Sequence, residues 1–142
     1  MISKHISEKE ATKSITALRL GLANTPNGNA LANMKQLAEK IFEPLREHVG
    51  GPIKINSMYR SEALNKAIGG SSRSQHCQGN AMDLDDIYGH KTNKEMFDFI
   101  REKLDFDQLI YEFGNEENPD WVHVSYVDKE KNRNRVLKAV RD

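Results

Sequence analysis

The sequence is organised around one stretch, Ser74-Gln75-His76-Cys77-Gln78-Gly79-Asn80-Ala81-Met82-Asp83-Leu84-Asp85. Within it, Gly79-Asn80 is a strong turn signal, because both residue types tolerate positive φ at low cost. From Ala81 onward, apolar and polar residues alternate as in a half-buried strand. A turn that feeds a strand brings His76 back beside Asp83. An imidazole nitrogen and a carboxylate oxygen are two of the three protein ligands that a catalytic zinc needs.

A third ligand of the same kind lies near the C-terminus. The segment from Trp121 to Tyr126 is rich in β-forming residues and alternates, so that His123 projects from one face of an expected strand. Together, His76, Asp83 and His123 would form a His-Asp-His metal site with an open position for water.

These residues stand in a pattern that resembles a known family. Ser74-x-His76-x-x-Gly79-x-Ala81-x-Asp83, followed by Asp120-Trp121-x-His123, is similar to the zinc D,D-peptidases of bacterial cell-wall metabolism. That family includes D-alanyl-D-alanine carboxypeptidases, D-Ala-D-Ala dipeptidases and phage cell-wall endopeptidases. The resemblance is closest to the short carboxypeptidase-like members, and it runs from about Ile53 to Tyr126.

The resemblance implies one zinc ion, held by His76, Asp83 and His123. It also implies that Asp120 is the general base and that Arg60, in the corner Tyr59-Arg60-Ser61, contacts the substrate. A guanidinium can donate paired hydrogen bonds to a carboxylate or to the carbonyl under attack. On spacing alone, a surface arginine paired with Glu62 or another acid is the better interpretation of Arg60. Ser74 is expected to orient the His76 turn and is counted with Arg60 among the substrate-binding residues.

The identity of the base stays open at this point. Many relatives carry glutamate where this chain has Asp120. Residues three apart on a straight strand also point to opposite faces, so Asp120 joins His123 only if Pro119-Asp120 forms a bend. The rival bases are Glu112, Glu116 and Glu117.

Other residues near the motif have more than one interpretation. Cys77 is the only cysteine, so an intramolecular disulfide is excluded. It is either a ligand or nucleophile, or a small side chain that points away from the metal, as alternation on an extended segment favours. His90 is a weak rival ligand, and a solvated loop histidine is the preferred interpretation. Asp85 and Asp86 are candidate acceptors for the second N–H of a ligand imidazole.

Composition limits the class of protein. With 142 residues the chain is expected to form one domain, and its net charge of zero gives no sign of a nucleic-acid partner. The N-terminus lacks the apolar segment of a signal peptide, and no run is long enough to span a bilayer. We therefore expect synthesis in the cytoplasm. The family resemblance implies access to a cell wall through a lysis system or a virion. Oligomeric state is not readable from the sequence.

The expected fold is α+β, hedgehog/D,D-peptidase-like, with a small, mainly antiparallel sheet packed against helices. Its parts are a helical region (1–50), a metal-site core (53–126) and a loosely packed or fraying tail (128–142). The expected elements, read from periodicity and caps, are helices over about 7–22, 30–48, 61–68 and 92–104 and strands over about 53–58, 81–85, 108–113 and 121–126. Pro44 is expected to kink or end the second helix.

The resemblance thus implies a zinc-dependent peptidase that hydrolyses peptide bonds involving D-amino acids in peptidoglycan, with the stem peptide as substrate. The alternative is a non-catalytic zinc module that recognises wall peptides or a protein partner. A site closed by a fourth protein ligand would favour this alternative, and an open position would favour the enzyme.

Overall fold

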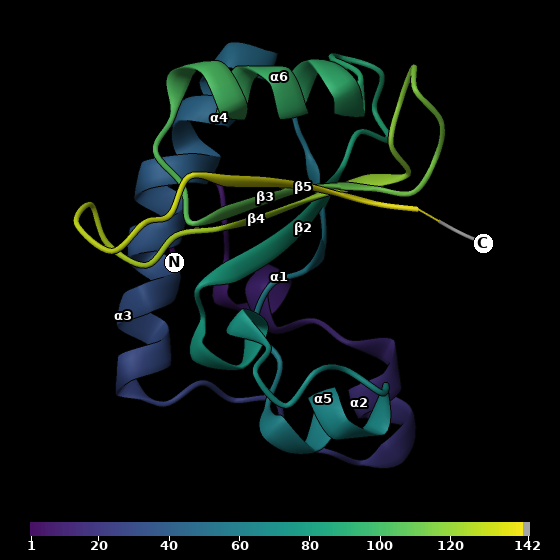
Figure 1. Cartoon of the computed structure of the whole chain (residues 1–142). Helices are drawn as coiled ribbons and strands as arrows, with labels where there is room; N and C mark the ends of the chain where they lie inside the picture. Colours follow the sequence, from purple (N-terminus) through teal and green to yellow (C-terminus); the bar gives the residue numbers. More distant parts are fainter. Residues whose placement is uncertain (141–142) are drawn as a thin grey trace.

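The computed structural model describes residues 1–140 and shows an α+β fold in which helices pack on a five-stranded sheet (Figure 1). The strand order is β1-β2-β4-β3-β5. The helical elements are α1 (Glu8–Thr12), α2 (Ile15–Leu20), α3 (Gly28–Leu37), the π-helical η1 (Ala38–Phe42), α4 (Glu43–Val49), α5 (Glu62–Ala67), the 3-10 turn η2 (Gln75–Gln78) and α6 (Asn93–Lys103). The strands are β1 (Lys54–Ser57), β2 (Ala81–Asp85), β3 (Gln108–Glu112), β4 (Trp121–Ser125) and β5 (Arg135–Ala139).

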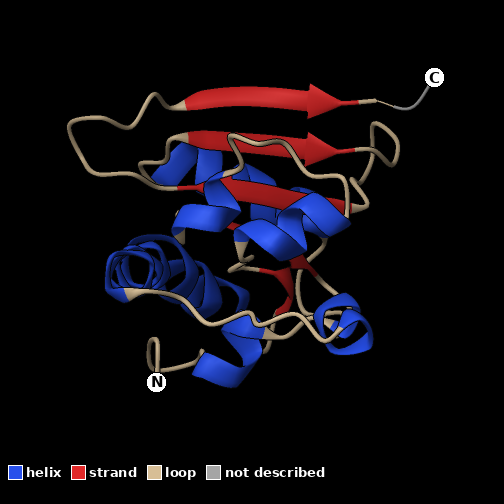
Figure 2. Ribbon diagram, turned by 90° about the horizontal axis from the view of Figure 1, so that it is seen from below, coloured by secondary structure: helices blue, strands red, loops and turns tan. Residues whose placement is uncertain are grey.

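The sheet separates a buried face from a face that carries polar side chains. Alternate residues of the three central strands are fully or almost fully buried: Met82, Leu84, Leu109, Tyr111, Val122 and Val124. They form one core cluster with apolar residues of α3, η1, α4 and α6. In Figure 2 the helices lie largely beneath the sheet. The period-two pattern of the sequence therefore directs Asp83 and His123 to the opposite face of the sheet.

The long second helix is confirmed, and Pro44 does not end it. The chain continues from α3 through η1 into α4, and Pro44 lies in the first turn of α4. Proline lacks an N–H and crowds the carbonyl four residues earlier. The wider π-helical turn directly before it accommodates this defect inside one continuous helical segment.

The prediction of a single N-terminal helix was wrong. Ser7 caps α1 as expected, but the helix ends at Thr12, and Ser14 caps a separate helix α2 by accepting from the Ala17 N–H at 3.1 Å. A serine inside a helical pattern offers the backbone this alternative cap. Ile15 and Leu18, which lie on the apolar stripe of a continuous helix over 7–22, are 68% and 82% exposed.

The prediction for the C-terminal tail was also wrong. Its residues form β5, which pairs with β3 in parallel and lies at one edge of the sheet. The preceding loop is anchored by hydrogen bonds from the Arg133 side chain to the buried Asp107, and Asn134 exchanges hydrogen bonds with the Phe106 backbone. These long-range anchors bring a largely exposed segment into the sheet. The last two residues of the expected tail lie outside the described part of the chain.

Within residues 1–140, none of the helices combines the length and the apolar character needed to cross a bilayer.

Candidate metal centre

His76 is positioned by a short, capped turn. Ser74 caps η2, its Oγ accepting from the His76 N–H at 3.3 Å, and Gly79 ends the turn with φ +79°. A Cβ at Gly79 would lie 2.3 Å from the carbonyl oxygen of Ala30, so only glycine fits both the conformation and the contact with α3. The turn buries His76, and the residue is 3% exposed.

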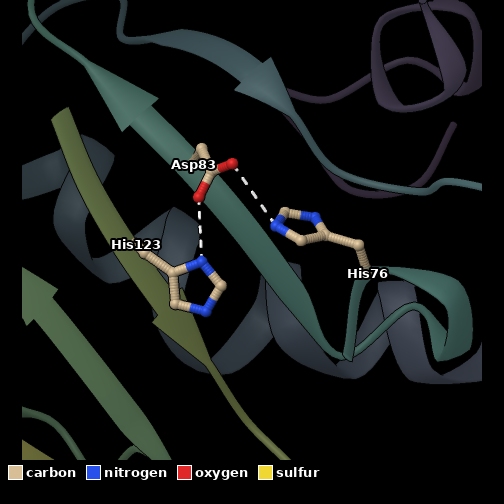
Figure 3. Close-up of side chains that lie close together, drawn as sticks. All are labelled: His76, Asp83 and His123. Carbon is tan, nitrogen blue, oxygen red and sulfur yellow. Dashed lines mark hydrogen bonds and ion pairs between the residues drawn. The ribbon is translucent and has the colours of Figure 1, made fainter. Parts of the chain in front are cut away.

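Asp83 and His123 come together through the pairing of two strands. They are directly opposite each other in the antiparallel register of β2 and β4. His123 Nδ1 lies 2.9 Å from Asp83 Oδ1, and His76 Nε2 lies 3.3 Å from Asp83 Oδ2. Figure 3 shows the carboxylate between the two rings, with one oxygen toward each. The three side chains lie together, as the sequence pattern predicts.

The second nitrogen of His76 identifies its tautomer. Nδ1 lies 2.7 Å from the backbone carbonyl oxygen of Met58, which only accepts hydrogen bonds, so Nδ1 carries a proton and donates it. In the neutral ring Nε2 is then an acceptor, and it faces another acceptor, Asp83 Oδ2. Two acceptors this close need either a proton on Nε2, which turns the contact into a hydrogen bond, or a metal ion that both atoms bind. The donor set therefore fits a metal ion.

The ligand atoms are compatible with one ion. The metal-binding atoms of His76, Asp83 and His123 all lie within 4.8 Å of one another. Among the residues that the structure describes, the cluster of His, Cys, Asp and Glu side chains close enough to share a metal consists of these three. Two imidazoles and one carboxylate are a ligand set of catalytic zinc sites, in which the fourth position takes water or substrate.

The electrostatics keep Asp83 ionised. Burial by itself would raise the pKa of this carboxyl, but hydrogen bonds from His123 and His76 and the charges of both rings outweigh burial and hold the pKa well below its usual range. Arg60 contributes a further positive charge, with Nη2 3.6 Å from Asp83 Oδ2. An ionised carboxylate is the form that binds a metal.

Arg60 is fixed at the edge of this cluster. Its Nε donates to Ser57 Oγ at 3.1 Å, and its Nη1 donates to Asn65 Oδ1 at 3.2 Å. Asn65 is buried and also donates to the Ser71 carbonyl. Sequence reasoning did not identify these supports of Arg60. No local motif marks them, because the α5 helix and the Ser71 loop bring them together.

The candidate bases lie outside the three-residue cluster. Asp120 is exposed, occupies a bend directly before β4, and donates its N–H to the Glu112 carbonyl at 2.9 Å. The bend is the condition under which Asp120 can turn toward the His123 face. Glu112 pairs with Trp121 in the sheet, and burial raises its pKa, with Asp83 adding to and His123 opposing the rise. Glu116 and Glu117, the other rivals, are exposed in the β3–β4 loop. The role of each stays a prediction.

The prediction that Asp85 or Asp86 accepts a hydrogen bond from a ligand imidazole was wrong. Asp85 accepts from Asn93, and Asp86 accepts from the Gly89 N–H, whereas His76 donates to the Met58 carbonyl. Met58 directly follows β1, and its backbone carbonyl, the acceptor that His76 uses, carries no sequence signal.

The remaining histidines and the cysteine are placed elsewhere. His90 is exposed, His5 pairs with Glu43, and His48 stacks on Phe99. Cys77 lies on the 3-10 turn rather than on an extended segment, is half-buried, and has its thiol pKa raised mainly by burial. Its sulfur is not part of the metal-binding cluster.

Comparison with known proteins places this geometry in a family. No curated protein matches the chain. A family model described as peptidase M15 matches residues 4–125. The match contains the three clustered side chains and ends at the last residue of β4. The chain therefore belongs to the peptidase M15 family of zinc-dependent peptidases, the family of the D-Ala-D-Ala carboxypeptidases.

Proposed function

We propose that this protein is a zinc peptidase that hydrolyses peptide bonds involving D-amino acids in bacterial peptidoglycan, as a D,D-carboxypeptidase or an endolysin-type endopeptidase. The observation that carries the proposal is the cluster of His76, Asp83 and His123 within 4.8 Å in a chain of the peptidase M15 family. We further propose that the chain works as one domain and reaches the wall through a lysis system or a virion.

In this proposal one zinc ion is held by His76 Nε2, a carboxylate oxygen of Asp83, and His123 Nδ1. These are the atoms that face one another in the cluster. Bound zinc supplies Lewis-acid chemistry: it lowers the pKa of a water molecule from about 15.7 to about 7 and polarises the substrate carbonyl. The Met58 carbonyl, by fixing the proton on Nδ1, keeps Nε2 of His76 free to act as a ligand.

Asp120 is the proposed general base. It would accept a proton from the attacking water and pass it to the leaving amine. Its position in the bend before β4 supports this role, because the side chain of a residue in a bend need not follow the alternating directions of the strand. Glu112 is the rival, supported by its electrostatic interactions with His123 and Asp83.

Arg60 is the proposed substrate clamp. Ser57 and Asn65 hold two of its nitrogens and so fix the plane of the guanidinium, while Nη2 is directed to the metal-binding cluster. A fixed guanidinium loses little conformational entropy when it binds a carboxylate or a carbonyl. Ser74 holds the His76 turn, and we propose that its substrate contact is secondary to that task.

The proposal is tested by digesting purified peptidoglycan and a pentapeptide that ends in D-Ala-D-Ala, with and without a chelator, and identifying the products by mass spectrometry. The expected result is a defined fragment whose release stops in chelator and returns when zinc is added. If zinc binds with one equivalent but neither substrate is cut, the protein is instead a non-catalytic module for wall peptides or a protein partner.

A further inference from the structure

A large pocket borders the metal-binding cluster. It has a volume of about 530 Å³ and runs along β1, all four residues of which line it. β1 is an edge strand, and the opposite walls come from α2, α5 and the loop after β2. In Figure 1, α2 and α5 lie together at the foot of the molecule. Sites for small ligands have volumes of this order.

The pocket and the metal-binding cluster share a wall. Ser57 lines the pocket and pairs with Asp83 in the sheet. Arg60 also lines the pocket, and its Nη2 lies 3.6 Å from Asp83 Oδ2. Ser57 and Arg60 therefore lie between the pocket and the cluster.

Apolar side chains on the pocket walls are exposed. Ile15, Ile68, Ile87 and Tyr88 are 68%, 45%, 54% and 54% exposed, although they come from three separate elements. Single exposed apolar residues are ordinary, but a group of them around one hollow is typical of a binding site. The short helix α2, which the sequence pattern predicts as part of a longer helix, supplies one of these walls.

The charged groups of the pocket favour an anion. Lys13, Lys54 and Arg60 line it together with one acid, Glu10. Burial raises the pKa of Glu10, and the three basic side chains outnumber this one acid among the lining residues. The lysines Lys13 and Lys54 are exposed and so can reach a ligand without losing a buried partner.

The geometry points to a subsite for an acidic residue of the peptide substrate, at a position away from the bond that is cut. Lys13 and Lys54 pair with its carboxylate, and the apolar walls contact the neighbouring aliphatic groups. This inference rests on the proposed function. The pocket is larger than a single alanine needs, so it suits several residues of a stem peptide, whose γ-linked D-glutamate carries a free carboxylate.

The test uses two peptides, L-Ala-γ-D-Glu-L-Lys-D-Ala-D-Ala and the same peptide with that free carboxylate converted to a carboxamide. The full chain, treated with chelator to prevent turnover, is titrated with each peptide and followed by ¹⁵N NMR. We expect the acid to bind about two- to fivefold more tightly, the range for exposed ion pairs, and to shift the signals of Ile15, Ile68 and Tyr88. Lys13→Ala and Lys54→Ala should remove the preference, and Lys129→Ala, an exposed lysine outside the pocket, should keep it.

Equal binding of the two peptides, no binding of either, or signal shifts confined to other surfaces would each overturn the subsite. Turnover of the same two peptides by the zinc-loaded chain separates this inference from the proposed function. If both peptides are cut without a binding preference, the enzyme stands and the subsite fails. If the acid is preferred but neither peptide is cut, the subsite stands and the proposed catalysis fails.

Discussion

The imidazole of His76 donates from Nδ1 to the backbone carbonyl of Met58 at 2.7 Å, while its Nε2 faces Asp83 Oδ2 at 3.3 Å. This pairing selects the tautomer that can bind a metal, and it uses an acceptor that no side-chain substitution removes. Partners of this kind orient metal-binding histidines in many sites. The tautomer of His76 is therefore fixed by the backbone at Met58, between β1 and α5, and not by an acidic side chain.

Replacing His76 should abolish zinc binding. In His76→Ala the remaining carboxylate and imidazole leave the ion only two protein ligands, fewer than zinc sites use. Metal content after dialysis, measured by mass spectrometry, should fall from one equivalent to background. His90→Ala is the control, because His90 is an exposed loop histidine outside the cluster, and it should keep one equivalent. Full zinc content in His76→Ala would exclude His76 as a ligand.

Asp120→Asn should keep zinc but lose turnover by about 10²- to 10⁴-fold, the usual contribution of a general base. The amide keeps the size of the side chain and cannot take up the proton. Metal content and kcat on the D-Ala-D-Ala pentapeptide are measured together, so that loss of metal is not mistaken for loss of the base.

The matched variant is Glu112→Gln. Glu112 interacts electrostatically with His123 and Asp83, so the amide should alter the pH profile and leave most of kcat in place. If instead Glu112→Gln loses turnover and Asp120→Asn does not, the base is Glu112.

The cluster could be predicted because its geometry follows from local patterns. The turn that ends at Gly79 brings His76 back toward the following strand, β2. Alternation places Asp83 and His123 on the face opposite the core. The Met58 carbonyl and the Asn65 amide could not be predicted in the same way. They reach His76 and Arg60 only after β1, α5 and η2 have packed, and none of them has a distinctive spacing in the sequence.

The edges of the fold were also beyond the sequence patterns. Val136 of β5 is 42% exposed, so the strand has little hydrophobic signal and depends on pairing with β3 and on the Arg133–Asp107 contact. At the other end, Ser14 competes as a helix cap within a pattern that a continuous helix also satisfies. In both regions tertiary contacts decide between conformations that local propensity leaves nearly equal.

Asp107 should stabilise the fold in a pH-dependent way. The hydrogen bond from Arg133 lowers the pKa of Asp107 to about 2 against the opposing effect of burial, and Gln75 and the Arg133 backbone add to the lowering. Because the pKa in the folded state lies below the unfolded value of about 3.9, the stabilisation is complete above that value. It is lost as the pH falls through about 4 toward about 2.

Asp107→Asn should therefore cost about 1–3 kcal/mol of unfolding free energy at pH 7, and the difference from the parent should shrink as the pH falls from about 5 to about 2. Urea unfolding at a series of pH values measures this. Asp105→Asn, two residues away and exposed, is the control and should stay within about 0.5 kcal/mol of the parent. A difference for Asp107→Asn that does not change with pH would exclude the electrostatic explanation.

Gly79→Ala should damage both stability and the metal centre, and Gly89→Ala separates the two causes. Both glycines have φ of +79°, but a Cβ at Gly89 meets nothing within 4 Å, whereas at Gly79 it would lie 2.3 Å from the Ala30 carbonyl oxygen. Gly89→Ala should thus show only the backbone cost, about 1–2 kcal/mol. Gly79→Ala should lose about 1–3 kcal/mol more through overpacking.

The extra cost in Gly79→Ala should appear at the metal-binding cluster as well. Relief of the clash with α3 requires η2 to move, and η2 carries His76, so zinc affinity should fall in Gly79→Ala and be unchanged in Gly89→Ala. Urea unfolding of the chelated protein gives the stability difference, and competition with a chromophoric chelator gives the affinity. Equal losses of stability in the two variants, or an unchanged affinity in Gly79→Ala, would show that the close approach of η2 to α3 does not position His76.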